Sequence, residues 1–140
     1  MAYLLDTCVI SEMVTPLPHQ TVLDWFEYQN ESTLFLSVLT LGEIQKGIYQ
    51  LPLGKRRVSL ETWYFDELRP SFEGRVLEID EPLIATWAKM LASLKPKGLV
   101  RPALDSLIEA TAQRHNLILV TRNVKNFIDS QVSVYNPWDE

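Results

Sequence analysis

The sequence predicts an α/β fold in which a five-stranded, mainly parallel sheet is covered by helices on both faces. Short runs of apolar and β-branched residues, each of strand length, alternate along the chain with longer segments whose apolar residues recur at helical spacing. Parallel strands require crossover connections, and right-handed crossovers place the connecting helices against the sheet. A length of 140 residues suits one domain, so we expect residues 1–140 to share a single core.

The elements follow in order along the chain. The expected strands are AYLL at 2–5, LFLSV at 34–38, RVLEI at 75–79, LILVT at 117–121 and VSVY at 132–135. The expected helices cover residues 22–29, 41–51, 56–68, 83–94 and 104–111. In the fourth of these helices the apolar residues form one continuous stripe. The segments TPLPHQ and KPKGLVRP contain the strongest helix breakers, and we interpret both as loops.

Composition narrows the possible functions. Hydrophobic residues at 46% and charged residues at 22% are typical of a globular protein, which argues against a disordered or fibrous chain. A net charge of −5 argues against a broad basic face for nucleic acid, although short basic clusters can still contact phosphates. The basic clusters are Lys55–Arg57; Lys95, Lys97 and Arg101; and Arg114, Arg122 and Lys125.

Two absences concern location and redox chemistry. The first apolar run is too short for a signal peptide and follows no basic leader, and no segment approaches the roughly 20 apolar residues of a membrane span. We therefore expect a cytoplasmic protein without a membrane partner. Cys8 is the only cysteine, which excludes an intrachain disulfide and a cysteine zinc site, and we expect it to be a small buried side chain.

Oxygen-bearing side chains are expected to converge at one edge of the sheet. Helices in this architecture run opposite to the strands and begin near the strands' carboxyl ends, where open α/β sheets bind ligands. Asp6 follows the first strand, Glu43 lies in the expected first turn of the helix after the second strand, and Asp105 lies at the start of the helix before the fourth. Thr121 ends the fourth strand, and Asn123 stands two residues beyond it.

Each acid also has a purely structural interpretation. Asp6 could close an Asx turn, and Asp105 could interact with the positive end of its helix. Glu43 could complete a capping box with Thr40, three residues before it.

Taken together, the structural interpretations are weaker, because three carboxylates at one edge repel one another unless a cation is present. Oxygen ligands suit Mg²⁺ better than zinc. His19 and His115 lie near no acidic motif, and we interpret both as surface residues.

Four motifs add a resemblance to a known family. They are LLDTCVISE, SVLTLGEIQKGI, RPALDSLIEATAQRHNLILVTRNVKNF and VYNPW. In this order they span nearly the whole chain and together resemble the PIN domain, in particular the VapC-type toxins of bacterial toxin–antitoxin pairs, close to the FitB branch.

The resemblance implies a fold, an activity and partners. The implied fold is a PIN-like three-layer sandwich with a five-stranded parallel sheet. The implied activity is endonucleolytic cleavage of RNA dependent on Mg²⁺ or Mn²⁺, by a protein that is usually a homodimer and is inhibited by a cognate, VapB-like antitoxin. Asp6, Glu43 and Asp105 match the family's metal-binding acids by position.

One departure from the family concerns the number of ions. The family often has a fourth acid in the TRNVKNF region, where this chain has Asn123 and Asn126, which can coordinate through a carbonyl but add no charge. Tight binding of a second ion is therefore left open. Because related toxins often carry asparagine at the first of these positions, we interpret the change as tuning of the activity.

The expected roles follow from the chemistry of phosphodiester cleavage. A bound metal lowers the pKa of its water and polarises the phosphoryl oxygen. We expect Asp6 and Asp105 to be the principal ligands. Glu43 is expected to bind the ion directly or through water and to orient or deprotonate the attacking water.

Neighbouring residues are expected to complete the site. Thr121 and Asn123 would support the ligands. Arg122 is either a phosphate contact or a surface charge.

Two alternatives are weighed against this function. A phosphoreceiver-like signalling domain would also have five strands, and Asp80 could be its phosphoacceptor, but Thr7 and Cys8 stand where adjoining acids are needed and Asn136 replaces the usual lysine. The other alternative is a catalytically weakened PIN domain that only binds.

The partner surface is also ambiguous. Trp25, Phe26, Trp63, Tyr64 and Phe65 could pack in a dimer, hold an antitoxin helix or fill the core.

Overall fold

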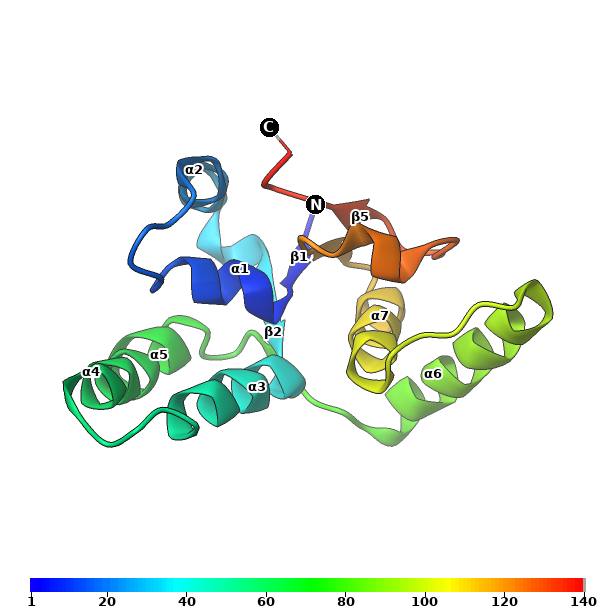
Figure 1. The fold of residues 1–140 in the computed structure, drawn as a ribbon. Coiled ribbons are helices and arrows are strands. Elements are labelled where there is room, and N and C mark those ends of the chain that lie inside the picture. The colour runs from blue at the N-terminus through cyan, green and yellow to red at the C-terminus, as the bar shows by residue number, and fades with distance from the viewer. Residues whose placement is uncertain (140) are drawn as a thin grey trace.

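The computed structural model describes residues 1–139, and its five strands form one sheet in which each neighbouring pair is parallel. The predicted five-stranded parallel sheet is therefore confirmed. The strand order is β3-β2-β1-β4-β5, which puts the first strand in the centre (Figure 1). The strands are β1 (Tyr3–Leu5), β2 (Leu34–Ser37), β3 (Val76–Leu77), β4 (Ile118–Val120) and β5 (Val134–Tyr135).

The helices overlap all the predicted helical segments. They are α1 (Thr7–Glu12), α2 (Gln20–Tyr28), α3 (Val38–Tyr49), α4 (Lys55–Trp63), α5 (Arg69–Ser71), α6 (Glu81–Leu94) and α7 (Ala103–His115). The short α1 was not predicted, because six residues are too few to show a helical period. None of the helices within residues 1–139 is long and apolar enough to cross a membrane.

The remaining helical turns are short. A π-helical turn, Tyr64–Leu68, joins α4 to α5, so the helix predicted over 56–68 continues to Ser71. Three 3₁₀ turns cover Glu31–Thr33, Lys95–Lys97 and Val124–Phe127. The last of them follows β4 and leads toward β5.

Alternation along the strands builds a core on each face of the sheet. Leu5 and Val120 are fully buried in one apolar cluster, which also contains residues of α1, α2 and α3. Leu4 and Leu119, their immediate neighbours, are fully buried in a second cluster with Ile108 of α7. Successive strand side chains point to opposite faces, so this pattern requires both faces to be covered.

The helices form a layer on each side of the sheet. Figure 1 shows α1, α3, α4 and α5 on one side of the central strands and α6 and α7 on the other. The outer helix α6 packs against α7 through Met90 and Leu94, which are buried with Ala110. The Trp87 indole of α6 also donates a 2.9 Å hydrogen bond to the Ser106 hydroxyl of α7. These contacts fix the first turns of α7 from the side away from the sheet.

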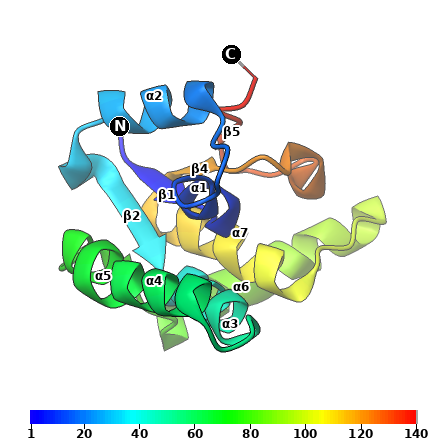
Figure 2. The same cartoon turned by 60° about the vertical axis from the view of Figure 1, so that its left-hand side comes forward.

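The carboxyl ends of three strands lead directly into polar residues. Asp6 follows β1, Thr121 follows β4, and Ser37, the last residue of β2, caps α3. Figure 2 shows β2 leading directly into α3. Since the sheet is parallel, these three strand ends lie on the same edge, where the candidate site is found.

Candidate active site

Asp6 caps a helix and also contacts the fourth strand segment. It is the N-cap of α1, and its Oδ1 accepts a 2.8 Å hydrogen bond from the Thr7 amide. Its Oδ2 accepts a 2.8 Å hydrogen bond from the hydroxyl of Thr121, which is fully buried. Asp6 itself is only 9% exposed. The carboxylate is therefore fixed in position on both oxygens by neighbours at the ends of β1 and β4.

The predicted capping box of Thr40 and Glu43 is wrong. Ser37 caps α3, because its hydroxyl accepts a 3.1 Å hydrogen bond from the Leu39 amide. The helix begins at Val38, which puts Glu43 in the second turn and leaves the buried Thr40 hydroxyl without a hydrogen-bond partner. Glu43 therefore does not cap α3, and the purely structural interpretation of Glu43 as part of a capping box is excluded.

Glu43 instead reaches toward α1. Its Oε1 accepts a 2.6 Å hydrogen bond from the Thr7 hydroxyl, in the first turn of that helix. Thr7 thus uses its backbone amide for Asp6 and its side chain for Glu43. This role of Thr7 was not predicted, because no local pattern connects two residues 36 positions apart.

Asp105 lies in the first turn of α7 and is affected by both other acids. Partial burial raises the pKa of its carboxyl above the ordinary value of 3.8, and the negative charges of Asp6 and Glu43 raise this pKa further. A 3.2 Å hydrogen bond from the Asn126 amide, together with the charge of Arg101, acts in the opposite direction. The three predicted acids therefore share one electrostatic environment, which we call the acidic edge.

The side chains of the acidic edge do not form a complete set of ligands around one metal position. Within residues 1–139, no three Asp, Glu, His or Cys side chains lie close enough together to hold one ion. The donors nearest these acids are neutral: Thr7, Thr121 and Asn126. The arrangement concentrates negative charge that these neutral hydrogen bonds do not cancel, and it presents oxygen atoms rather than nitrogen or sulfur atoms.

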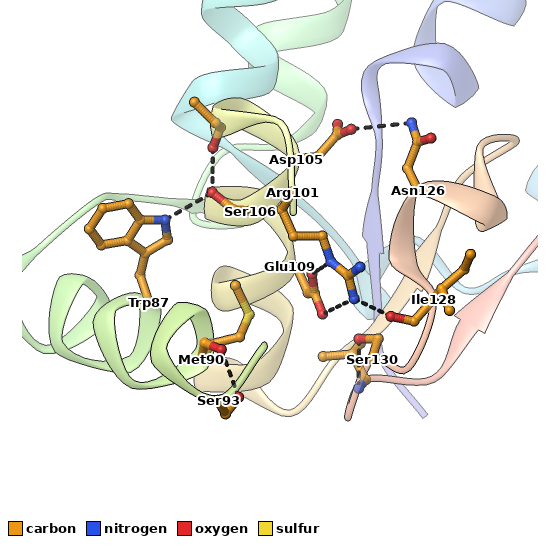
Figure 3. Close-up of polar contacts among 12 residues, drawn as sticks. Trp87, Met90, Ser93, Arg101, Asp105, Ser106, Glu109, Asn126, Ile128 and Ser130 are labelled. Atoms are coloured by element: carbon orange, nitrogen blue, oxygen red, sulfur yellow. Dashed lines mark hydrogen bonds and ion pairs between the residues drawn. The ribbon is translucent and has the colours of Figure 1, made fainter. Parts of the chain in front are cut away.

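Of the two asparagines in the TRNVKNF segment, Asn126 makes the contact with the acidic edge. Its Nδ2 donates to Asp105 Oδ2 (Figure 3). Asn123 is exposed, and its backbone amide donates a 3.1 Å hydrogen bond to the Thr121 hydroxyl. Thr121 thus contacts Asp6 through its hydroxyl, while Asn123 contacts Thr121 through its backbone amide.

Arg122 lies beside the site with its side chain exposed. Its guanidinium carbon is 5.3 Å from the centre of the Trp138 ring, a cation–π distance. Its backbone amide donates to the sulfur of Cys8 at 3.5 Å. Cys8 is half-buried rather than buried, and burial together with the Asp6 charge raises the pKa of its thiol. His19 and His115 are exposed, as predicted.

A groove runs along α4 on the same side of the sheet as α1. Three hollows of about 250, 280 and 450 Å³ share Trp63 as a lining residue. Val14, Arg56 and Leu60 line two of them, and Met13 and Phe26 line the hollow of about 250 Å³. We call this surface the Trp63 groove.

The other predicted partner aromatics are divided between core and surface. Trp25 packs against Tyr3 with ring centres 5.3 Å apart, and Tyr64 is buried, whereas Phe65 is 52% exposed. Tyr64 is therefore part of the core, and Trp25 packs against it.

Comparison with known proteins gives consistent matches. The sequence profile of the PIN domain matches residues 3–129. Toxin FitB of Neisseria gonorrhoeae is 36% identical over 137 residues, covering 98% of this chain and 99% of that protein. VapC ribonuclease Y4jK of Sinorhizobium fredii is 36% identical over 135 residues, covering 96% of each. The crystal structure of FitAcB from Neisseria gonorrhoeae superposes with a TM-score of 0.94 at 36% identity and covers 99% of both chains.

Proposed function

The chain belongs to the PIN domain family, and we infer from this membership that it is a VapC-type ribonuclease, the toxin of a toxin–antitoxin pair. We further propose that it cuts RNA internally and that cleavage depends on Mg²⁺ or Mn²⁺. The observation that supports the proposal is the acidic edge, where the charges of Asp6 and Glu43, from two distant segments, act on the carboxyl of Asp105. Two relatives of similar length are named toxin FitB and VapC ribonuclease Y4jK, and these names also support the proposal.

The residues of the acidic edge fit a hard divalent cation. All the side-chain atoms offered by Asp6, Glu43 and Asp105 are carboxylate oxygens, which Mg²⁺ and Mn²⁺ prefer. The charges of Asp6 and Glu43 raise the pKa of Asp105, and a cation would relieve that repulsion. When bound, the ion would lower the pKa of a water molecule and offset charge on the phosphate.

Different residues of the chain would bind the ion, orient its ligands and activate the attacking water. Asp6 and Asp105 would hold the ion, and Thr121 would keep the Asp6 carboxylate oriented through its 2.8 Å hydrogen bond. Glu43, held by Thr7, would orient the attacking water or accept its proton. Asn126 would steady Asp105 without adding charge.

Substrate contacts would lie beside the acids. Arg122 is exposed near Trp138, and we propose it as a phosphate contact. Asn123, also exposed, would bind substrate or ion through its side-chain carbonyl.

The decisive experiment uses a circular RNA as the substrate. Only an endonuclease opens a closed circle, so linear product formed with Mg²⁺ or Mn²⁺ and abolished by EDTA would support the proposed activity. The same experiment tests the binding-only alternative, which predicts RNA retention without linear product. A circle left intact by wild-type protein with either metal would contradict the ribonuclease proposal.

An antitoxin partner and a homodimer are further parts of the proposal. The matched structure from Neisseria gonorrhoeae is named FitAcB, and a second one is named as FitAB bound to a DNA fragment. We propose that the antitoxin of this chain occupies the Trp63 groove, where apolar side chains and the charges of Arg56 and Glu67 would meet an amphipathic segment. Size-exclusion chromatography with light scattering would give the oligomeric state of the toxin alone and in the complex.

The phosphoreceiver alternative is excluded by the sheet. Receiver domains have the strand order 2-1-3-4-5, whereas this sheet has the order 3-2-1-4-5. The strand before Asp80 is therefore at the edge of the sheet rather than beside β1. Asp80 has a different role, because its carboxylate caps α6 by accepting a 3.0 Å hydrogen bond from the Leu83 amide.

A further inference from the structure

Arg101 and Glu109 form a buried ion pair next to the acidic edge. The Arg101 Nε donates a 2.8 Å hydrogen bond to Glu109 Oε1, and the two side chains are 2% and 1% exposed. Arg101 was one of a basic cluster with Lys95 and Lys97 that could contact phosphates, and for Arg101 that interpretation is wrong. A guanidinium this deeply buried is not a phosphate contact.

The same guanidinium also holds a third segment. Its Nη2 donates a 2.5 Å hydrogen bond to the Ile128 carbonyl, directly after the 3₁₀ turn that carries Asn126 (Figure 3). Arg101 precedes α7, Glu109 lies within α7, and Ile128 belongs to the segment between β4 and β5. One side chain thus joins the two segments whose side chains, Asp105 and Asn126, are bonded to each other.

The start of α7 needs such a connection. Its N-cap is Pro102, which has no side-chain acceptor for the free amides of the first turn. Arg101, immediately before this uncapped start, is bonded to Glu109 in the second turn of the helix. The first turn, which contains Asp105, is therefore enclosed between two bonded residues.

A stabilising role alone does not account for a pair of this kind. Buried ion pairs often contribute little net stability, because desolvation of both charges offsets their attraction. A pair of apolar residues would fill the same space, but it would not supply a donor to the Ile128 carbonyl. The planar fork of arginine can serve two acceptors at once, which the single ammonium of lysine does less well.

We propose that Arg101 is a positioning residue, which holds the Asn126 turn against α7 so that the Asn126 amide orients Asp105 for its metal. This inference rests on the proposed metal-dependent function, but the tether itself is a property of the metal-free protein. Loss of the tether should loosen residues 124–128 and weaken metal binding, while the remaining fold persists.

Two variants separate the tether from simple stability. Arg101→Met/Glu109→Leu removes both charges together, so no buried charge is left unpaired, but the donor to Ile128 is lost. Arg101→Lys keeps a positive charge opposite Glu109 but loses the planar guanidinium that donates to both Glu109 and the Ile128 carbonyl. The matched control is Arg57→Met, which removes an arginine from a partly exposed ion pair. In that pair Arg57 Nε and Glu61 Oε1 lie 2.9 Å apart.

Hydrogen exchange of the full-length, metal-free proteins is measured by mass spectrometry, and Mn²⁺ binding is measured by calorimetry. We expect the double variant to unfold cooperatively, to exchange faster at residues 124–128 than wild type, and to bind Mn²⁺ about 10- to 100-fold more weakly, the usual effect of losing a group that orients a metal ligand. Arg101→Lys should change both in the same direction, and Arg57→Met should match wild type.

Several outcomes would overturn the inference. Wild-type exchange at 124–128 in the double variant would show that no tether was lost. Faster exchange spread evenly over the chain, with Mn²⁺ affinity unchanged, would show a stabilising role only. If the double variant does not fold, Arg101→Lys decides by the same two measurements. Should wild-type protein bind no Mn²⁺ and cut no RNA, the proposed function fails, and the exchange measurement still decides whether the tether exists.

Discussion

Thr7 Oγ1 donates a 2.6 Å hydrogen bond to Glu43 Oε1 and so connects the first turn of α1 to the second turn of α3. The bond fixes a long acidic side chain that otherwise has several freely rotating bonds. Since Thr7 also donates its amide to Asp6, one residue aligns two of the three acids. The geometry of the acidic edge therefore depends on a residue that carries no charge.

Replacing Thr7 by Val should lower cleavage about 10- to 100-fold, because Glu43 loses the donor that orients it. The cost in unfolding free energy should be about 1 kcal/mol, the usual value for one hydrogen bond. Thr7→Ser, which keeps the hydroxyl, is the matched control and should stay close to wild type. Steady-state cleavage of a fluorescent RNA and urea unfolding measure the two effects. Equal rates for the Val and Ser variants would show that the bond has no role in activity.

Asp6→Asn and Asp105→Asn should each abolish metal-dependent RNA cleavage while the fold persists. Asparagine keeps an oxygen acceptor for Thr121 or Asn126 but removes the charge that binds the cation. Circular dichroism and cleavage of the circular RNA measure fold and activity.

Asp129→Asn is the control for both variants, because Asp129 is exposed and has a φ of 59°, which asparagine also adopts readily. We expect this variant to cut RNA like wild type. Undiminished cleavage by Asp6→Asn or Asp105→Asn would remove that residue from the site.

Metal-free protein should become more stable when Asp105 is replaced by Asn. Burial and the charges of Asp6 and Glu43 raise the pKa of Asp105 in the folded state above 3.8, so the folded carboxyl holds its proton more tightly than the unfolded one. Stability is therefore lost as the pH rises from about 3.8 through the folded-state pKa, and the whole penalty is present above that pKa. Below the unfolded-state pKa the penalty is absent.

The measurement is thermal unfolding of both proteins in EDTA, near pH 7 and near pH 3.5. Asp105→Asn should melt above wild type at the higher pH, and the difference should shrink at the lower pH. Added Mg²⁺ should raise the melting temperature of wild type more than that of the variant. A variant that is less stable than wild type near pH 7 in EDTA would contradict the predicted repulsion.

Ser37 and Thr40 should respond differently to loss of their hydroxyl groups. Ser37→Ala removes the cap of α3 and should cost about 1 kcal/mol. Thr40→Val keeps the shape of a side chain whose buried hydroxyl has no partner, so stability should be unchanged or higher. Urea unfolding of the two variants provides the measurement. A larger loss of unfolding free energy for Thr40→Val than for Ser37→Ala would contradict this assignment and favour Thr40 as the cap.

Trp63→Ala should weaken antitoxin binding at least about 30-fold, which corresponds to about 2 kcal/mol and is typical of a buried aromatic anchor. Trp63 lines all three hollows of the groove, whereas Phe65, two residues later in the π-helical turn, lines none of these three. Phe65→Ala is therefore the control. Calorimetric titration with the antitoxin measures both affinities, and equal affinities would place the antitoxin elsewhere.

The edge of the sheet on which the three acids lie was predictable because the rule involved depends on chain direction alone, whereas the turn of α3 that carries Glu43 was not. Parallel strands share one carboxyl edge, so a residue after β1 and residues in the helix after β2 and before β4 must approach each other wherever the exact boundaries fall. The alternation of Leu4 and Leu5 between two cores follows equally from the strand period.

Boundaries and long-range polar contacts were harder to predict. The predicted strand 34–38 included Val38, which left Thr40 as the first available cap and excluded Ser37, the residue that caps α3. The Arg101–Glu109 pair was missed because charge in a sequence is usually interpreted as surface, and nothing local indicates the burial of both partners. Propensity and periodicity describe neighbours along the chain, whereas these contacts depend on packing.

The bond between Thr121 and Asp6 crosses 115 positions, and Asp105 must also be present before the acidic edge exists. A chain that leaves the ribosome amino end first has Asp6 and Glu43 early and lacks the rest until residues 105–121 have emerged. Nascent chains and products of interrupted translation would thus be harmless to the messenger RNA that encodes them.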